Sequence, residues 1–231
     1  MEAAEVTSVA NHSPAHGLHE LAERENAALI VVASTHTARA GRVLPGSTAE
    51  RLLHGSPCPI AVAPKGYTRR DEPGIIGCGF DGSQSARRAL EAAERIAAAT
   101  GARLRVIRAF TPLAFDFPPG SVDMGGAGYN DSLQDRAADE LDAAVTTLAG
   151  DVRAEPFFAV GNAAEILAEA SEQLDFLLLG SRGYGPLHSV VVGGVAGRVV
   201  REAACPVIVL PRKAGHVADD SLFAATDSVH A

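Results

Sequence analysis

Hydrophobic residues follow two different periodicities along the second half of the chain. Short apolar runs of the kind that form strands lie at residues 74–80, 103–110, 152–158, 175–180 and 206–210. Between them, apolar residues recur at three- or four-residue spacing over residues 83–100, 131–149, 163–172 and 195–203. That spacing is typical of helices that pack by one face. The order βαβαβαβαβ predicts an α/β fold, an open parallel five-stranded sheet with helices on both faces.

Glycine and proline mark the ends of several of these elements. Gly101 follows the first helix and is expected to cap it. Residues 111–130 are rich in Gly and Pro, show no periodicity, and predict a loop. Pro156 interrupts the third strand, which is tolerable only at the edge of a sheet.

The beginning of the chain repeats the end of this pattern. Residues 28–65 align without a gap with residues 175–212, at an offset of 147 residues. The second copy has about 100 residues upstream of the matching segment and the first has fewer than 30, so the first copy is the C-terminal part of the same unit. Its strands are expected near residues 4–9, 29–33 and 59–63. The predicted organisation is an incomplete domain at 1–66, a linker at 67–73, a complete domain at 74–212 and a disordered polar tail at 213–231.

Composition excludes several classes of partner. The 231 residues are 47% hydrophobic and carry 20 Lys plus Arg against 28 Asp plus Glu, a net charge of −8. This balance repels nucleic acid and anionic membrane surfaces. Because no apolar run approaches the roughly 20 residues that span a bilayer, and no signal peptide is evident, we expect a cytoplasmic protein. Cys58, Cys78 and Cys205 form no CxxC pair and predict buried, reduced thiols rather than a disulfide framework or zinc site.

A glycine motif follows the fourth strand of the complete copy. Gly180-Ser181-Arg182-Gly183, nine residues and then Gly193 resemble the nucleotide loop of universal stress proteins, whose pattern ends in Ser or Thr where this chain has Gly194. Phe80-Asp81-Gly82-Ser83 and the segment 204–209 also resemble that family. The resemblance covers nearly all of residues 74–212 and, more loosely, residues 1–66. The chain is identified as a member of the family, of the tandem-domain type with an incomplete N-terminal domain.

This resemblance implies a flavodoxin-like fold, of the adenine nucleotide alpha hydrolase type, with strand order 3-2-1-4-5. Ligands of such folds bind where the strand order reverses, here between the strands that end at Asp81 and Gly180. Glycines there let the backbone approach phosphate, and the next helix offers a positive dipole end. The family pattern implies ATP, with or without Mg²⁺, as the cofactor. The implied site comprises Gly79, Phe80, Asp81 on the nucleoside, Ala109 beside the adenine, Arg182 as a charge contact, and Gly180, Gly183, Gly193, Gly194 and Val195 around the phosphates and ribose.

The implied function is that of an ATP-binding regulatory module in stress response and not of an enzyme. The chain has no Walker lysine, and no paired carboxylates or activated nucleophile lie near the glycine loop. Family domains associate through their last strands, which implies either a homodimer or pairing of residues 59–63 with 206–210 within one chain. The alternative function is a structural or dimerisation module that binds no nucleotide.

Several motifs have a plain structural interpretation. The glycines at 180, 183, 193 and 194 could simply build a tight loop and a close helix contact. Asp81, with Ser83 and Ser85, could mark only a helix N-terminus. In the first copy, Ser47 and Glu50 fit a capping box, which predicts Ser47 as a helix cap.

Other patterns are weaker. Gly77, Gly79 and Gly82 fit a dinucleotide fingerprint, but only residues 74–76 precede it as a strand and no acidic residue follows the second strand. His12, His16 and His19 lack further metal ligands and predict a solvated helix face. The first copy has Ala33 and His36 where the second has Gly180 and Gly183, so we expect it to bind no nucleotide.

Overall fold

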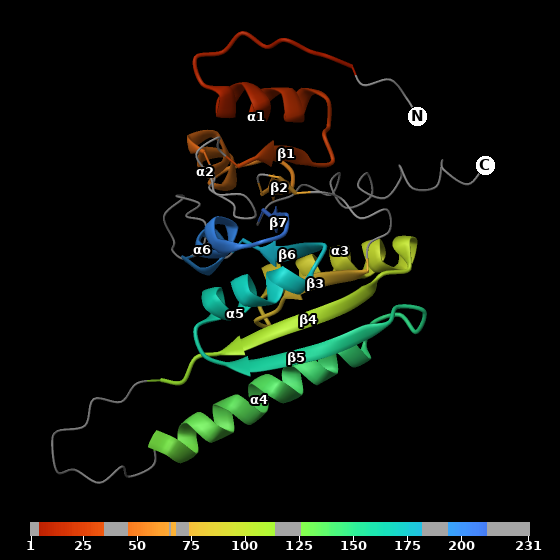
Figure 1. Cartoon of the computed structure of the whole chain (residues 1–231), viewed down its shortest axis with the longest axis vertical. Coiled ribbons are helices and arrows are strands. Elements are labelled where there is room, and N and C mark those ends of the chain that lie inside the picture. Colours follow the sequence, from red (N-terminus) through yellow and green to blue (C-terminus); the bar gives the residue numbers. More distant parts are fainter. Residues whose placement is uncertain are drawn as a thin grey trace, which may run out of the picture.

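The computed structural model describes residues 5–34, 46–64, 66–67, 74–113, 126–181 and 194–211. Within these ranges the strands form one sheet in the order β1-β2-β7-β6-β3-β4-β5 (Figure 1). The strands are β1 (Ile30–Ala33), β2 (Ile60–Ala63), β3 (Ile75–Gly79), β4 (Arg103–Phe110), β5 (Ala154–Val160), β6 (Phe176–Gly180) and β7 (Val207–Leu210). The helices are α1 (Pro14–Arg24), α2 (Ser47–Leu53), α3 (Gln84–Thr100), α4 (Gly126–Thr146), α5 (Ala163–Ala170), the 3₁₀ turn η1 (Ser171–Gln173) and α6 (Gly194–Glu202).

The complete copy has the predicted fold. Its strands β5-β4-β3-β6-β7 are all parallel and follow the expected order 3-2-1-4-5. Gly101 ends α3 in the left-handed region at φ 69°, where a side chain would be strained. Pro156 lies in β5 at the edge of the sheet, where a missing donor is tolerated.

Helix α4 starts earlier than its sequence suggested. The loop was expected to continue to Asn130, whereas α4 begins at Gly126. The Asn130 side chain explains part of this difference, because its amide accepts from the Leu113 backbone N–H at 2.9 Å and donates to the Leu113 carbonyl at 3.1 Å. This pair of bonds attaches the second turn of α4 to the segment that leaves β4, a contact that local composition does not reveal.

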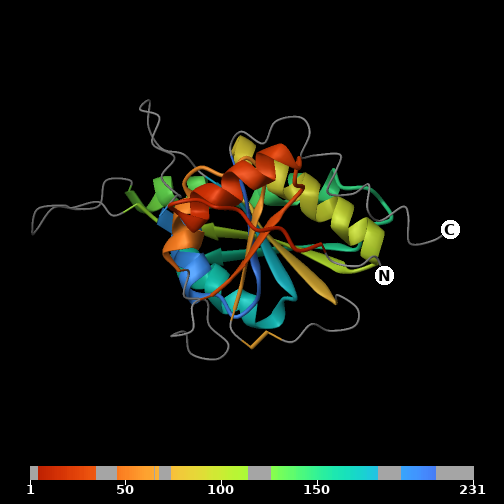
Figure 2. The same cartoon turned by 90° about the horizontal axis from the view of Figure 1, so that it is seen from above.

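Two cores lie on the two faces of the sheet. One is formed by α3 and α4 over strands of the complete copy, with Ile76, Leu104, Val106 and Leu141 among its fully buried side chains. The other core joins the two copies, because it combines side chains of α1 and α2 with those of α5 and α6. Figure 2 shows α3 on one side of the strands and α5 and α6 on the other.

Strands β2 and β7 join the two copies into one sheet. They pair antiparallel, with Ile60 opposite Val209 and Val62 opposite Val207. This is the intramolecular pairing of residues 59–63 with 206–210 that the family resemblance implied. Because β6 occupies the other flank of β7, both flanks of this strand are paired within the chain.

Two expectations for the first copy were wrong. Residues 5–9 form no strand; in the family order this strand would pair with a second strand that the first copy lacks, so its backbone has no ladder to join. Helix α2 is capped by Gly46, and Ser47 is its first helical residue without a side-chain capping bond. A capping box would need Ser47 as the N-cap, whereas the N-cap is Gly46 and the helix begins one residue earlier. Glycine is an acceptable N-cap.

Asp175 fixes the start of the complete copy's sheet. This buried carboxylate accepts the backbone N–H groups of Gly74 at 2.6 Å and Ile75 at 2.9 Å, and the Asp175 carbonyl accepts the Tyr67 hydroxyl at 2.9 Å. The entry into β3 is thereby held against the start of β6. The equivalent residue in the first copy is Ala28, which suits a copy that has no β3 to hold.

The three cysteines are free and buried, as predicted. Burial raises the pKa of the Cys205 thiol to about 12 and raises those of Cys78 and Cys58 as well. Among the helices in the described ranges, none has the length and apolarity that a membrane crossing requires.

The shared core leads to a prediction about fragments. Residues 1–66 alone would keep β1 and β2 but lose β7 and the α5 and α6 side of their core, so we expect this fragment to be unfolded or aggregated. Residues 70–215 alone should fold, and their exposed β7 edge should make them dimerise. Circular dichroism and analytical ultracentrifugation measure both outcomes, with the intact chain as the control. A soluble first fragment that melts cooperatively would contradict the prediction.

Candidate functional site

A cavity of about 330 Å³ opens at the carboxyl ends of β3, β4 and β6. Its walls come from the N-terminal parts of three helices, with Ser83 and Ala86 at α3, Ala163 and Leu167 at α5, and residues 194–196 at α6. Strand β3 leads into α3 over one face of the sheet, whereas β6 is followed by α6 over the other. The cavity therefore lies at the point where the strand order reverses, which is where open α/β sheets bind ligands. We call this cavity the crevice.

The structure brings together seven of the ten residues predicted for the site. They all line the crevice: Gly79, Phe80, Asp81, Ala109, Gly180, Gly194 and Val195. Arg182, Gly183 and Gly193 lie outside the described residues. Residues from two motifs separated by about a hundred positions in the sequence therefore share one cavity, and their roles in binding stay predictions.

The floor of the crevice is apolar. Ile107, Leu167 and Leu179 contribute to it alongside Gly79. Leu167 and Ala163 were not predicted as site residues, because in the sequence they belong to the apolar stripe of a core-facing helix. Only the position of α5 beside the strand ends distinguishes them from other core residues.

The backbone of Ala109 faces the crevice. In a parallel strand, the N–H and C=O of one residue point toward the same neighbouring strand. Those of the next residue point toward the strand on the other side. Phe80 N–H donates to the Ile107 carbonyl, on the β3 side, and Gly161 N–H donates to the Phe110 carbonyl, on the β5 side. Ala109 follows Ile107 by two residues and so directs its groups toward the β3 side, where β3 has already ended at Gly79. One donor and one acceptor are therefore presented at the crevice.

The turn after β3 organises the start of α3. Asp81 Oδ1 accepts the Ser83 backbone N–H at 2.9 Å, and Ser83 Oγ caps the helix by accepting from Ala86 N–H at 3.2 Å. Gly82 has φ 77°, a conformation that favours glycine. The interpretation of this segment as a helix N-terminus is thus correct, and it leaves Asp81 at the rim of the crevice.

Gly180 has a packing role that is independent of any ligand. A Cβ at this position would collide with the backbone of Ser85 and Ala86 in the first turn of α3. Glycine thus allows α3 to approach the end of β6. Around Gly194, by contrast, a Cβ would meet no atom of the described residues within 4 Å. Packing against α3 therefore requires glycine at position 180, whereas no contact with a described residue requires it at position 194.

The dinucleotide fingerprint does not describe a phosphate turn. Gly77 and Gly79 both lie inside β3 rather than in a loop after it. Side chains fill the space that a Cβ would occupy at each, Leu174 at Gly77 and Leu179 at Gly79. These glycines let leucines pack against the strand, which explains their spacing without a cofactor.

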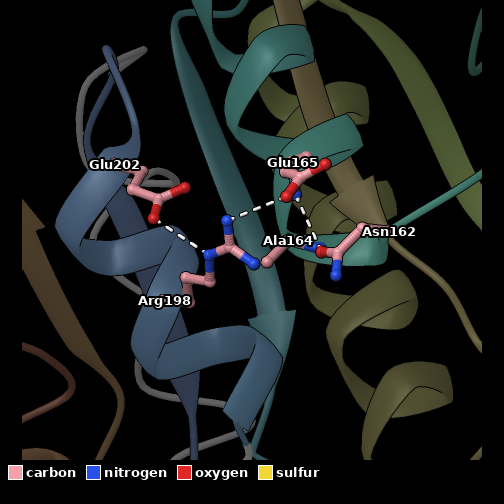
Figure 3. A network of polar contacts seen from close by, with 5 residues as sticks. All are labelled: Asn162, Ala164, Glu165, Arg198 and Glu202. Carbon is pink, nitrogen blue, oxygen red and sulfur yellow. Dashed lines mark hydrogen bonds and ion pairs between the residues drawn. The ribbon is translucent and has the colours of Figure 1, made fainter.

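An ion-pair network fixes α6 against α5 (Figure 3). Arg198 places Nη2 at 2.9 Å from Glu165 Oε1 and Nε at 3.0 Å from Glu202 Oε1. The hydrogen bond to Glu202, followed by that to Glu165, raises the pKa of the guanidinium. Asn162 Oδ1 caps α5 by accepting the backbone N–H groups of Ala164 and Glu165. Two of the three helix ends that wall the crevice are thereby held together.

Arg108 is a cationic residue of the crevice that sequence reasoning missed. Its Nη2 lies 3.1 Å from Glu140 Oε2 on α4, and the side chain is 14% exposed. Within the described part of the chain, its Nη1 is buried and has no hydrogen-bond partner. The sequence offers no signal for it, because an arginine in an edge-proximal strand usually faces solvent.

Among the described residues, no group of three His, Cys, Asp or Glu side chains could hold a metal ion.

The Gly180 contact leads to a prediction about stability. Gly180→Ala should lower the free energy of unfolding by about 1–3 kcal/mol, because the added methyl group must displace the α3 backbone. The matched control is Gly194→Ala, whose methyl group meets no described atom and should leave stability unchanged or slightly higher. Urea unfolding of both variants is the measurement. Equal stability of the Gly180 variant and the unsubstituted chain would refute the packing role.

Comparison with known proteins agrees with the architecture. The family model of the universal stress protein family matches residues 2–64 and 74–211. A universal stress protein of Mycobacterium tuberculosis is 28% identical over 205 residues, which cover 87% of this chain and 70% of that protein. One from Thermus aquaticus is 33% identical over 135 residues, 57% of this chain and 93% of that protein. A solved structure, a putative universal stress protein from Pseudomonas aeruginosa, covers 95% of this chain and 73% of its own, with TM-score 0.67 and 16% identity. The chain belongs to the universal stress protein family.

Proposed function

We propose that this chain is a non-catalytic, cytoplasmic regulatory module of stress response that binds ATP in the crevice. The observation that carries the proposal is the meeting of two sequence motifs, around Asp81 and around Gly180, in one cavity beside the outward-facing backbone of Ala109. A volume of about 330 Å³ suits a ligand of the size of a nucleotide.

The base would lie on the apolar floor. Adenine presents an N6 donor next to an N1 acceptor, and the C=O and N–H of Ala109 complement this pair. Ile107, Leu167 and Leu179 offer apolar surface to its faces. Guanine presents an acceptor and a donor in the opposite order, so the same backbone pair favours adenine over guanine.

The phosphates would lie at the start of α6. This helix end provides backbone N–H groups and the positive end of the helix dipole. Among the described residues, no atom lies within 4 Å of the place a Cβ of Gly194 would take, and Val195 lines the crevice beside it. Family resemblance adds Gly183, Gly193 and Arg182 to this part of the site. Because Gly194 replaces a residue with a hydroxyl group, the phosphates would depend more on backbone donors than in other members of the family.

A structural module without ligand is the second candidate, and one observation favours it. The contact between Gly180 and the α3 backbone accounts for this glycine without a phosphate. A joint core already gives the two copies a structural relation. Direct titration separates the candidates, because a purely structural module would bind no nucleotide.

The proposed position of the base predicts the effect of a single substitution. Ala109→Leu should lower ATP affinity at least tenfold, because the larger side chain occupies the space intended for adenine. Ala159→Leu is the matched control, since Ala159 pairs with Ala109 on the adjacent β5 but does not line the crevice. Isothermal titration calorimetry with ATP and with GTP is the measurement, and ATP should bind more tightly. If the Ala109 variant bound ATP as well as the control, the base would have to lie elsewhere.

The two copies also predict the number of sites. Calorimetry should give one nucleotide per chain, because the first copy has Ala33 at the position of Gly180 and its β1 pairs only with β2. No described strand corresponds to β3 beside β1, so the first copy has no switch point. A stoichiometry of two would contradict this assignment.

A further inference from the structure

An arginine occupies the same place in both copies of the repeat. Arg51 is the fifth residue of α2, and Arg198 is the fifth residue of α6. The two positions correspond at the same offset that aligns the rest of the repeat. In both copies this helix packs on the helix that precedes the neighbouring strand, α1 in the first copy and α5 in the second. The repeat therefore shows one arginine in two environments.

Two carboxylates neutralise the arginine of the second copy. Glu165 lies three residues after the N-cap of α5, Asn162, and Glu202 lies one turn beyond Arg198 on α6 (Figure 3). Both reach the guanidinium at hydrogen-bond distance, which leaves it a structural link between two helices.

Neither carboxylate has a counterpart in the first copy. Gly55 stands at the position of Glu202. At the repeat offset Leu18 stands at the position of Glu165. Counted from the helix N-caps, Ser13 of α1 and Asn162 of α5, the equivalent residue is His16. Arg51 instead donates from Nη1 to Ser13 Oγ at 3.3 Å, and no described carboxylate lies within ion-pair distance of it. A cation is retained while the groups that balance it are replaced by a glycine and an imidazole.

A separate cavity occupies this place between α1 and α2. Its volume is about 300 Å³, and its polar lining consists of Ser13, His16, His19 and Arg51, with Gly55 at one wall. It shares no residue with the crevice. The missing side chain at Gly55 leaves room where the second copy has a carboxylate.

The charged and titratable side chains that line the cavity are Arg51 on α2 and the imidazoles of His16 and His19 on α1. His16 and His19 have their rings stacked with centroids 6.5 Å apart. Each uses Nε2 for a glutamate one turn along α1, Glu20 at 3.1 Å and Glu23 at 3.3 Å. These glutamates do not line the cavity, and their bonds leave the Nδ1 atoms of both rings available. On α2, His54 is occupied by the carbonyl of Glu50.

We propose that Ser13, His16, His19 and Arg51 form a second binding site, which takes the phosphate group of a small phosphomonoester. A guanidinium fork, a hydroxyl and, when both rings are protonated, the Nδ1–H groups of two imidazoles supply donors from both helices. A phosphate has enough acceptor oxygens to engage all of them. The cavity is large enough for the phosphate and a short carbon chain. This site does not depend on the proposed nucleotide function, because the two cavities have no residue in common.

The test uses the intact chain and the imidazole resonances of its histidines. Inorganic phosphate and glycerol 3-phosphate are titrated separately at constant pH and ionic strength, with glycerol as the uncharged control, while ¹H–¹³C NMR follows the ring signals. We expect saturable shifts of His16 and His19 with both phosphates, and tighter binding of glycerol 3-phosphate. Equal affinity for the two phosphates would overturn the phosphomonoester assignment, and the absence of saturable shifts would overturn the site.

Three variants sharpen the result. Arg51→Gln should weaken glycerol 3-phosphate binding at least tenfold. His16→Glu should abolish it while the melting temperature stays equal or rises, because the variant restores the Arg–Glu pair of the second copy. Arg24→Gln is the matched control, since Arg24 is an exposed arginine of α1 that pairs with Glu25 away from the cavity. Undiminished binding in folded Arg51→Gln, or an equal loss in Arg24→Gln, would show a non-specific charge effect and refute the site.

Discussion

The antiparallel contact between β2 and β7 is the interaction on which this molecule depends. It is short, with three residue pairs from Ile60 opposite Val209 to Val62 opposite Val207. Yet it closes the open flank of both strands and makes one sheet from a complete and an incomplete unit. The core on one face then includes side chains of both copies. An incomplete unit with two strands could not bury enough apolar surface alone, so this pairing is what allows it to persist in a folded state.

The same contact supports the crevice. Val199 and Val200 of α6 belong to the core that also contains Leu52 and Leu53 of α2. Helix α6 is therefore held by the first copy on one side and by the Arg198 bond to Glu165 on the other. Its first turn walls the crevice. The incomplete copy thus serves as a support for a helix end whose position determines what the neighbouring cavity can bind.

Sequence reasoning succeeded where the signal was local or periodic. The strands and helices of the complete copy follow from apolar spacing. Residues such as Asp81 and Gly180 could be placed in one site because the family resemblance implied the strand order and its switch point. It failed where a distant partner decides the outcome. Residues 5–9 lack the neighbouring strand they would need. Asn130, which was expected in the loop, lies in α4 and bonds to Leu113. Leu167 and Arg108 could not be predicted as crevice residues, because the register of one helix and one strand against the others places them there.

Comparison of the two copies distinguishes residues that are explained by packing from residues that are not. Asp175 holds the start of β3, and its counterpart in the copy without β3 is Ala28. Gly180 makes room for α3, and its counterpart where no α3 exists is Ala33. Glu202 bonds to Arg198, and its counterpart is Gly55. In the first copy, each of these three residues is replaced. For Asp175 and Gly180 the strand or helix that they contact is missing as well, and for Glu202 the ion pair is missing. Arg51 is different, because it remains after both carboxylates that neutralise its equivalent are gone. Arg51 lies beside two imidazoles, and no described carboxylate is within ion-pair distance of its guanidinium. This arrangement is more consistent with a ligand that brings its own negative charge than with a remnant of the contact that Arg198 makes between α5 and α6.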